Sequence, residues 1–482
     1  MKSRRHLLFS ILALSALASI IISACAPVAI PTSAPAPTSA AQPTSAPAPT
    51  NAPAPTTATQ PTTAPTAASQ PTTAATSAPG GATTLQVWWV TSSPEYSKAL
   101  RAIFDQYEQA HPGIKINSTF YSYNDMVAAG APALQSGNPP DIMFTDPSPP
   151  VIPNYIKAGY LVDLTDIAAQ KKWADRLAPG MLTFYGPIHD NKIYGAPISP
   201  AVRGFFYNKD IMKAIGGSEP KTFDELLALA DKAKAAGYIP FGLGNNTSWS
   251  SEYYWLNPTY LRWANEDWQK IVADNMTCKP GVPWGGEDVR QSLTDLVKWE
   301  KAGYFNPGYQ GIGETDVHLE FAKGKMLMYF YNAASQNVAL KADNPPFEIG
   351  FFNFPPIYPD KPLLSMSDPG NLMVIPKDAK NQAQALDFMD WMLSPEVEQT
   401  LAADGIIPAH KADYSKVNLP VPWMQAELDQ LSKQTAISWQ NWLVPGFGDV
   451  TGPEVQSLLA GEKSVDDVLK VFEAKYKEGC KL

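Results

Sequence analysis

Three short apolar segments alternate with two amphipathic segments near the start of the charged part of the chain. The apolar segments cover residues 85–90, 114–120 and 141–144, and apolar residues at helical spacing fill the intervals between them. Strands that are separated by helices pair in parallel, because the helix returns the chain to the edge where the first strand began. This order predicts an α/β fold built on a doubly wound sheet.

Ligands of doubly wound sheets bind beyond the C-terminal ends of the strands. In this chain the predicted ends are residues 89–92, 121–123 and 145–146. Trp89, Ser92 and Asp146 stand at these ends and are therefore candidate ligand-binding residues. Trp89 also fits a core position, Ser92 a helix cap beside Pro94, and Asp146 a turn or a helix cap.

Mixed aromatic and polar side chains follow at residues 201–210, between one α/β region and the next. We interpret this segment as a crossing between two lobes, and Pro-rich turns near 354–362 as a second link. Arg203 lies at the crossing, where it either binds solute or braces the hinge. This interpretation predicts a molecule of two lobes, with a cleft between them that holds a ligand. Its lobes are lobe 1 over residues 85–200 and 355–408, and lobe 2 over residues 201–354 and 409–482.

The first residues have the pattern of an export signal. Lys2, Arg4 and Arg5 precede an apolar run over 7–24 that contains no charge. The run ends in small residues before Cys25, as in the bacterial lipobox, where the Cys becomes the lipidated first residue of the mature chain. We expect residues 1–25 to be a lipoprotein signal peptide rather than an uncleaved anchor helix. The folded part then lies outside the cytoplasm, at the cell surface or in the periplasm, tethered to a membrane.

Residues 26–84 carry no charge and consist mainly of Pro, Ala, Thr and Ser. Such a segment buries too little apolar surface to fold, and its prolines favour extended conformations. We interpret it as a disordered spacer.

Charge excludes one class of partner. The formal net charge is −9, and it becomes about −12 without the three basic residues of the leader, whereas a nucleic-acid-binding protein needs a basic face. Nucleic acid is therefore not an expected partner. The 13 Trp, 20 Tyr and 19 Phe residues suit a large core, and those beside Asn, Gly and Pro suit contacts with a ligand.

With Cys25 assigned to the lipid, Cys278 and Cys480 remain. Outside the cytoplasm two such residues either pair or stay free. A bridge would attach the C-terminal tail to the loop around Cys278.

The chain from Leu85 to its C-terminus resembles the extracellular solute-binding proteins of ATP-binding-cassette sugar importers, the maltose-binding-protein-like class. The landmarks that carry this resemblance occur in the family's order. They are Gln135-Ser136-Gly137-Asn138-Pro139-Pro140-Asp141-Ile142, Gly195-Ala196-Pro197, Tyr207-Asn208-Lys209-Asp210, Phe321-Ala322-Lys323-Gly324-Lys325-Met326, Ala385-Leu386-Asp387-Phe388-Met389, Ser394-Pro395-Glu396 and Gly405-Ile406-Ile407-Pro408. The resemblance implies a two-lobe, periplasmic-binding-protein-like α/β fold, whose doubly wound sheets are joined by a hinge that the chain crosses more than once. It also implies capture of one solute, expected to be an oligosaccharide, by hinged closure of the lobes. It further implies delivery to a membrane permease by a monomer that needs no cofactor or metal and performs no chemistry.

The resemblance also implies where solute is held. Asp146 lies where members of the family carry a hydroxyl-binding acid, and Trp255 where they place a stacking aromatic. The usual aromatic after the 326–330 strand is missing, and Tyr331 or Asn332 takes its place. Asp368 and Gly370 match a Gly-rich segment that approaches the solute. Of Trp439 and Trp442, one is expected in the cleft, with Trp439 preferred, and the other in the core.

Three rival functions remain open. A lipid-anchored glycoside hydrolase needs two carboxylates on either side of the scissile bond, and no motif marks such a pair or a metal site. A binding protein for a polyamine or another small polar solute would use acids between aromatics, such as Asp146, Glu252, Glu314 and Asp368. A purely structural surface protein would suit the spacer but not a hinged two-lobe pattern.

Overall fold

A computed structural model describes residues 82–91, 93–147, 151–411, 418–433, 435–437 and 439–482. The predicted signal peptide with Cys25 and nearly all of the predicted spacer lie outside these residues. The first strand, β1, covers Thr83–Val90, so it includes the last two residues assigned to the spacer. Within the described part, no helix has both the length and the apolar character needed to cross a membrane.

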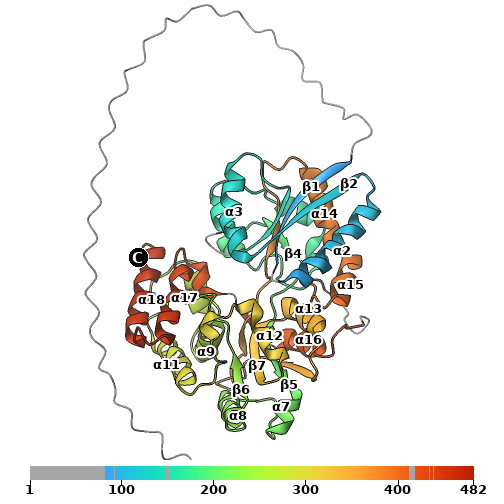
Figure 1. The fold of residues 1–482 in the computed structure, drawn as a ribbon. Helices are drawn as coiled ribbons and strands as arrows, with labels where there is room; N and C mark the ends of the chain where they lie inside the picture. The colour runs from blue at the N-terminus through green and yellow to red at the C-terminus, as the bar shows by residue number, and fades with distance from the viewer. Residues whose placement is uncertain (1–81, 92, 148–150, 412–417, 434, 438) are drawn as a thin grey trace, which may run out of the picture. The chain divides into compact units, whose positions relative to one another are not determined.

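The first lobe is built on a five-stranded sheet in the order β2-β1-β3-β10-β4. β1 pairs in parallel with β2 and with β3, which confirms the predicted doubly wound start, and β10 runs antiparallel to β3 and β4. Figure 1 shows α2, α3 and α14 around this sheet. The other elements of the first lobe are β2 (Ile114–Tyr121), β3 (Ile142–Thr145), β4 (Gly195–Pro197), β10 (Leu372–Val374), α2 (Pro94–Ala110), α3 (Tyr123–Gln135), α4 (Ile152–Lys157), α5 (Thr165–Gln170), α6 (Trp173–Arg176), α14 (Gln382–Met392) and α15 (Pro395–Ala403).

The second lobe is built on a four-stranded sheet in the order β6-β7-β5-β8. β6 and β7 are parallel, whereas β5 runs antiparallel to β7 and β8. A two-stranded sheet, β9 with β11, lies in the same lobe. The elements are β5 (Arg203–Asn208), β6 (Ile239–Gly242), β7 (Met326–Asn332), β8 (Ile349–Phe352), β9 (Leu364–Met366), β11 (Thr435–Ile437), α7 (Lys209–Ala214), α8 (Phe223–Ala235), α9 (Glu252–Trp263), α10 (Trp268–Met276), α11 (Glu287–Lys301), α12 (Val317–Ala322), α13 (Ala333–Asp343), α16 (Met424–Lys433), α17 (Gly448–Leu459) and α18 (Val465–Gly479).

Helix starts follow the local chemistry of the sequence. Ser93 caps α2, with Pro94 at its first position, and its hydroxyl accepts a bond from the Tyr96 amide at 3.1 Å. Ser464 and Asp467 form a reciprocal capping box at the start of α18. These short polar residues satisfy amide groups that have no partner inside the helix.

Two connecting segments run side by side between the lobes. Ala201 pairs with Asp368 in an isolated antiparallel bridge, and the Ala201 amide donates to the Asp368 carbonyl at 2.8 Å. Gly370 has a φ of +72°, and a Cβ there would lie 2.6 Å from the Ser199 carbonyl oxygen. Only glycine fits this close approach of two backbones.

The predicted second link near residues 354–362 therefore lies too early in the sequence. Phe354, Leu364 and Met366 are buried in the core of the second lobe. After β8 the chain therefore stays in the second lobe until Met366, and residues 367–371 then lead back to the first sheet. Pro-rich turns suggested a crossing because proline interrupts regular elements, but here they connect β8 to β9 within one lobe.

Asn337 of α13 connects the lobes at a second place. Its amide nitrogen donates to the Gly405 carbonyl, which follows α15 in the first lobe, at 3.1 Å. The same nitrogen donates to the Glu427 carboxylate of α16 at 2.6 Å, and the Asn337 oxygen accepts from the Trp423 indole at 2.7 Å. Three hydrogen bonds, to groups from three different segments, thus meet on the Asn337 side chain.

Cys278 and Cys480 form a disulfide, with an S–S distance of 2.12 Å and a sequence separation of 202 residues. The bond attaches the end of α18 to the loop after α10. A cross-link over so long a loop restricts the unfolded chain strongly.

We expect a C278S/C480S variant to lose ~2–4 kcal/mol of unfolding free energy, because the unfolded state regains the entropy of the open loop. Urea unfolding of the oxidised protein and of the variant measures the difference. Equal midpoints for both proteins, with the oxidised bond verified by thiol labelling, would contradict the expectation.

Candidate functional site

A cavity of about 510 Å³ opens between the two lobes, a volume typical of sites for small organic ligands. The lobes contribute residues of similar kinds, mainly aromatic, hydroxyl and carboxylate side chains. First-lobe and connecting-segment residues in the lining are Val90, Thr91, Tyr96, Ser122, Tyr123, Asn124, Phe144, Asp146, Pro147, Tyr185, Ser199, Pro200, Ala201, Asp368, Gly370 and Asn371. Second-lobe residues in the lining are Arg203, Thr247, Trp249, Tyr253, Gly313, Glu314, Tyr331, Asn332, Ala334, Ser335, Trp439, Trp442 and Leu443.

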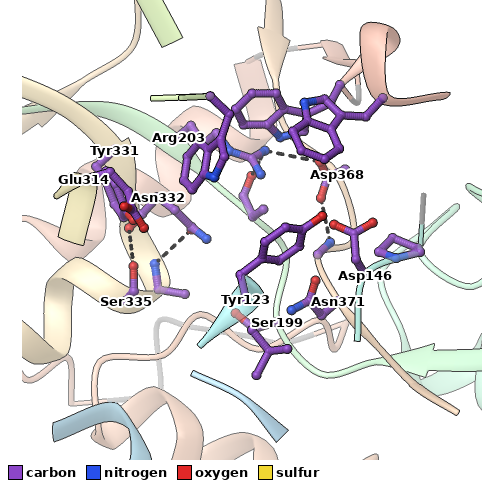
Figure 2. A pocket seen from close by; sticks show the side chains of 18 of the residues that line it. Tyr123, Asp146, Ser199, Arg203, Glu314, Tyr331, Asn332, Ser335, Asp368 and Asn371 are labelled. Atoms are coloured by element: carbon purple, nitrogen blue, oxygen red, sulfur yellow. Dashed lines mark hydrogen bonds and ion pairs between the residues drawn. The ribbon is translucent and has the colours of Figure 1, made fainter. Parts of the chain in front are cut away.

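Asp146 and Tyr123 form the polar part of the first-lobe wall. Asp146 directly follows β3, and Tyr123 is the first residue of α3, just beyond the end of β2. Their side chains are hydrogen-bonded, and Figure 2 shows them next to each other. Burial, and then the charge of Asp146, raises the pKa of Tyr123 well above its ordinary value. The phenol therefore stays protonated as a donor, and the strand-end rule is what places both groups in the cavity.

Arg203 and Asp368 form an ion pair at the connecting segments (Figure 2), with Nη1 and Oδ2 3.2 Å apart. The two residues are only 7% and 5% exposed. Burial lowers the pKa of the Arg203 guanidinium and Asp368 raises it, and the net result is a pKa above the ordinary value. The Asp368 Oδ1 atom accepts the Gly370 amide at 2.8 Å, so both carboxylate oxygens are held. Arg203 lines the cavity, while its Nε atom is buried and meets no acceptor among the described residues.

Four rings of the second lobe, Trp249, Tyr253, Trp439 and Trp442, form what we call the aromatic wall. Trp249 contacts Tyr253 and Trp439 edge-on, each with ring centres 5.8 Å apart. Trp439 lies 6.4 Å from Trp442, and the Arg203 guanidinium is 5.3 Å from the Trp439 ring centre. Edge-on contacts lock each ring in place, so the wall presents a fixed apolar surface to the cavity.

Glu314, Asn332 and Ser335 lie on the side of the cavity away from Asp146 (Figure 2). Thr247 donates to the Glu314 carboxylate. The Asn332 oxygen caps α13 by accepting the Ala334 amide at 3.3 Å, and the Ser335 hydroxyl donates to the Asn332 carbonyl at 3.2 Å. Carboxylates thus stand at two separate places in the cavity.

The structure brings together most of the residues that the sequence singled out. Asp146, Arg203, Tyr331, Asn332, Asp368, Gly370 and Trp439 line the cavity. Ser92 lies outside the described residues. The expectation that one of Trp439 and Trp442 belongs to the core is wrong, because both rings line the cavity.

The predicted ligand-binding roles of Trp89 and Trp255 are also wrong. Neither ring is exposed or lines the cavity. Trp89 shares the buried face of β1 with Leu85 and Val87 and stacks on Phe144 at 4.2 Å. Trp255 packs against Phe472 of α18 at 5.4 Å. Side chains alternate across a strand, so the phase of β1 sends Trp89 into the core.

Sequence reasoning missed Tyr185, Trp249, Tyr253 and Asn371 as cavity residues. For Trp249 a signal existed, because it follows the polar residues 245–248, which come shortly after β6. Tyr253 is two positions from Trp255, which the sequence favoured. No group of three or more His, Cys, Asp or Glu side chains within the described part of the chain has a geometry that could hold a metal ion.

Comparison with known proteins identifies the class. A model of the bacterial extracellular solute-binding protein family matches residues 91–399. A multiple sugar-binding protein of Streptococcus mutans is 25% identical over 262 residues, which are 54% of this chain and 60% of the relative. A probable sugar-binding periplasmic protein of Mesorhizobium japonicum is 44% identical over 159 residues, which are 33% of this chain and 36% of the relative. The chain therefore spans less than two thirds of the length of either relative.

A solved chitin oligosaccharide binding protein has the same fold. It superposes with a TM-score of 0.71 at 21% identity, covering 84% of this chain and all of the other. The architecture of this chain, two lobes around a cavity, agrees with the fold of this neighbour and with the family whose model matches residues 91–399. Because the family match spans more than half of the sequence, this chain belongs to the bacterial extracellular solute-binding proteins.

Proposed function

We propose that this protein captures a carbohydrate, expected to be a short oligosaccharide, in the cavity between its lobes and delivers it to an ABC permease. The observation that carries the proposal is the cavity itself, which combines an ion-paired arginine and two further carboxylates with a wall of four aromatic rings. Sugars present hydroxyl groups to carboxylates and guanidinium, and they present C–H faces to rings. The sugar-binding names of the relatives support the same class of solute.

Closure of the lobes is part of the proposal. The paired segments through Ala201 and Asp368 form a narrow connection, which suits a hinge, and solute that touches both lobes would favour the closed form. The closed form then docks on the permease. A monomer is sufficient for this cycle, and it involves no catalysis and no cofactor.

We further propose that the protein is anchored outside the cytoplasm by a lipid on Cys25, with residues 26–84 as the spacer. The family is extracellular, and the basic and apolar leader supports export. Replacement of Cys25 by Ser is the direct test. The lipoprotein assignment requires this variant to move from the membrane fraction to the soluble fraction, and unchanged fractionation would contradict it.

Thermal unfolding with a panel of solutes tests the main proposal. Maltotriose and chitotriose represent neutral oligosaccharides, and the panel adds monosaccharides, spermidine and organic acids. A solute that binds only the native state raises the melting temperature as its concentration increases. A rise with an oligosaccharide supports carbohydrate capture, and a rise with organic acids alone would overturn it.

The carboxylates favour one alternative, a polyamine or another cationic solute. Among the described residues, Asp146, Glu314 and Asp368 line the cavity, whereas Arg203 supplies the one cationic side chain. A melting-temperature rise with spermidine and none with sugars would select this alternative.

The same charge balance predicts discrimination among sugars. We expect an acidic trisaccharide, such as trigalacturonate, to bind at least about tenfold more weakly than a neutral trisaccharide, because its carboxylates would face Asp146 and Glu314. Calorimetric titration at low and high salt measures the difference, which should shrink as salt screens the repulsion. Stronger binding of the acidic sugar would refute the charge argument.

A further inference from the structure

Trp442 is the member of the aromatic wall that reaches the opposite lobe. Its ring meets Tyr123 of the first lobe edge-on, with centres 6.2 Å apart and planes at 85°. Tyr123 in turn is hydrogen-bonded to Asp146. The orientation of the Trp442 indole therefore affects both the wall and the contact between the lobes.

The back of this indole is held by a residue that does not line the cavity. Trp442 Nε1 donates to Glu252 Oε2 at 2.9 Å, and the Thr451 hydroxyl donates to Glu252 Oε1 at 2.6 Å. Asn441 also hydrogen-bonds to this carboxylate and donates to the Thr451 hydroxyl at 2.8 Å. Glu252, at the start of α9, is fully buried.

The Trp442 ring is also confined by the backbone at Gly448. A Cβ at that position would lie 2.9 Å from Trp442 Cδ2, so the ring packs directly on the main chain of α17. A hydrogen bond at Nε1 and close packing on a ring face together leave the indole a single orientation.

We infer that Glu252 is a positioning residue for solute binding, which acts by fixing the Trp442 indole where it contacts both the solute and Tyr123. The inference rests on the proposed function, because it assumes that the cavity holds solute. A buried carboxylate is costly unless donors surround it, and three side chains converge on this one with no cation among them. A hydrophobic residue would fill the space at lower cost but would leave the indole N–H without an acceptor.

The protonation of Glu252 gives a signature that a purely structural role would lack. Burial raises the pKa of Glu252 to about 7, although its three hydrogen-bond donors lower it. The titratable groups whose charges interact with it are Tyr260 on the same helix and Tyr123 across the cavity, and Tyr123 also interacts with Asp146 and Asp449. All of these neighbours are phenols or acids, so the carboxyl of Glu252 is the group expected to titrate near neutral pH.

The first test follows the Trp442 indole N–H resonance in solute-free protein with 15N-labelled tryptophan, assigned by its loss in W442F. We expect this signal to shift with a midpoint near pH 7 in the wild type and to stay constant in E252Q, whose amide oxygen still accepts the bond. A signal that is independent of pH in the wild type, or that titrates equally in E252Q, would overturn the link between the two residues.

The second test is a double-mutant cycle on affinity, using maltotriose or chitotriose, whichever raises the melting temperature more. With Trp442 intact, E252M should weaken binding about tenfold, whereas E252Q, which keeps an acceptor for the indole, should lose much less affinity than E252M. In the W442F background, E252M should change affinity less than about twofold. D141N, which alters another buried carboxylate that does not line the cavity, should leave affinity unchanged. Equal losses from E252M in both backgrounds would refute positioning while carbohydrate capture stands. If no sugar of the panel binds the wild type, the proposed function and this inference both fail. If E252M does not fold, E252Q, W442F and their combination give the same cycle, with a smaller expected effect.

Discussion

Replacing Arg203 by alanine is expected to destabilise the solute-free protein by ~3–5 kcal/mol and to weaken solute binding by at least about tenfold. The variant leaves the buried Asp368 carboxylate without its cation, 3.2 Å from where the guanidinium stood. It also removes from the cavity lining the guanidinium that lies 5.3 Å from the Trp439 ring centre. Urea unfolding measures the first effect and calorimetric titration of a bound trisaccharide measures the second.

Arg262→Ala is the matched control for this experiment. Arg262 forms the other strongly buried arginine pair among the described residues, with its Nη2 atom 2.6 Å from Asp295 Oδ2, and neither residue lines the cavity. The control should lose similar stability and keep its affinity. If R203A retains wild-type affinity while it loses stability, Arg203 braces the hinge and does not contact the solute.

The sequence located Arg203 and Asp146 because local patterns mark where strands begin and end. A change from apolar periodicity to polar residues identified the end of β3, and the ends of parallel strands meet at one edge of a sheet. The same local reasoning identified the β-α-β-α-β start of the first lobe. It did not predict the antiparallel pairing of β10 and β5, because their partners are distant in sequence.

The same local patterns could not predict whether an aromatic side chain faces the core or the cavity. Polar and apolar residues alternate in β1 only as far as Val87. Trp88 and Trp89 then place one ring on each covered face of the sheet, so the residue types there do not show which ring faces the core. Every residue of α9 is buried, and helical periodicity therefore does not distinguish Tyr253, which lines the cavity, from Trp255, which does not. The link between Trp442 and Glu252 joins residues 190 positions apart, and no local pattern encodes it.

Raising the pH is expected to destabilise the protein through Glu427. Burial raises the pKa of this carboxyl from its ordinary value of 4.5 to about 8, although Asn337 lowers it. Below about pH 4.5 Glu427 is protonated in both the folded and the unfolded state. Between pH 4.5 and 8 the unfolded state releases its proton first, so the free energy of unfolding falls as pH rises. The full loss is on the order of 3–5 kcal/mol above pH 8. Glu252 contributes in the same direction, with its pKa raised by burial to about 7.

Glu427→Gln isolates this contribution. Glutamine keeps an oxygen that accepts from Asn337, but its NH₂ group takes the place of Oε1, which has no partner among the described residues. The variant should therefore be slightly less stable than the wild type at pH 5, by about 1 kcal/mol, and more stable at pH 9. E478Q changes a mostly exposed carboxylate in α18 and should leave the pH dependence of the wild type intact.

Urea unfolding from pH 5 to 9 measures all three proteins, and parallel curves for wild type and E427Q would show that Glu427 ionises without cost in the folded state. A curve that crosses the wild type near neutral pH would establish that the contact between the lobes at Asn337 is held by a carboxyl group that is neutral when the protein is most stable.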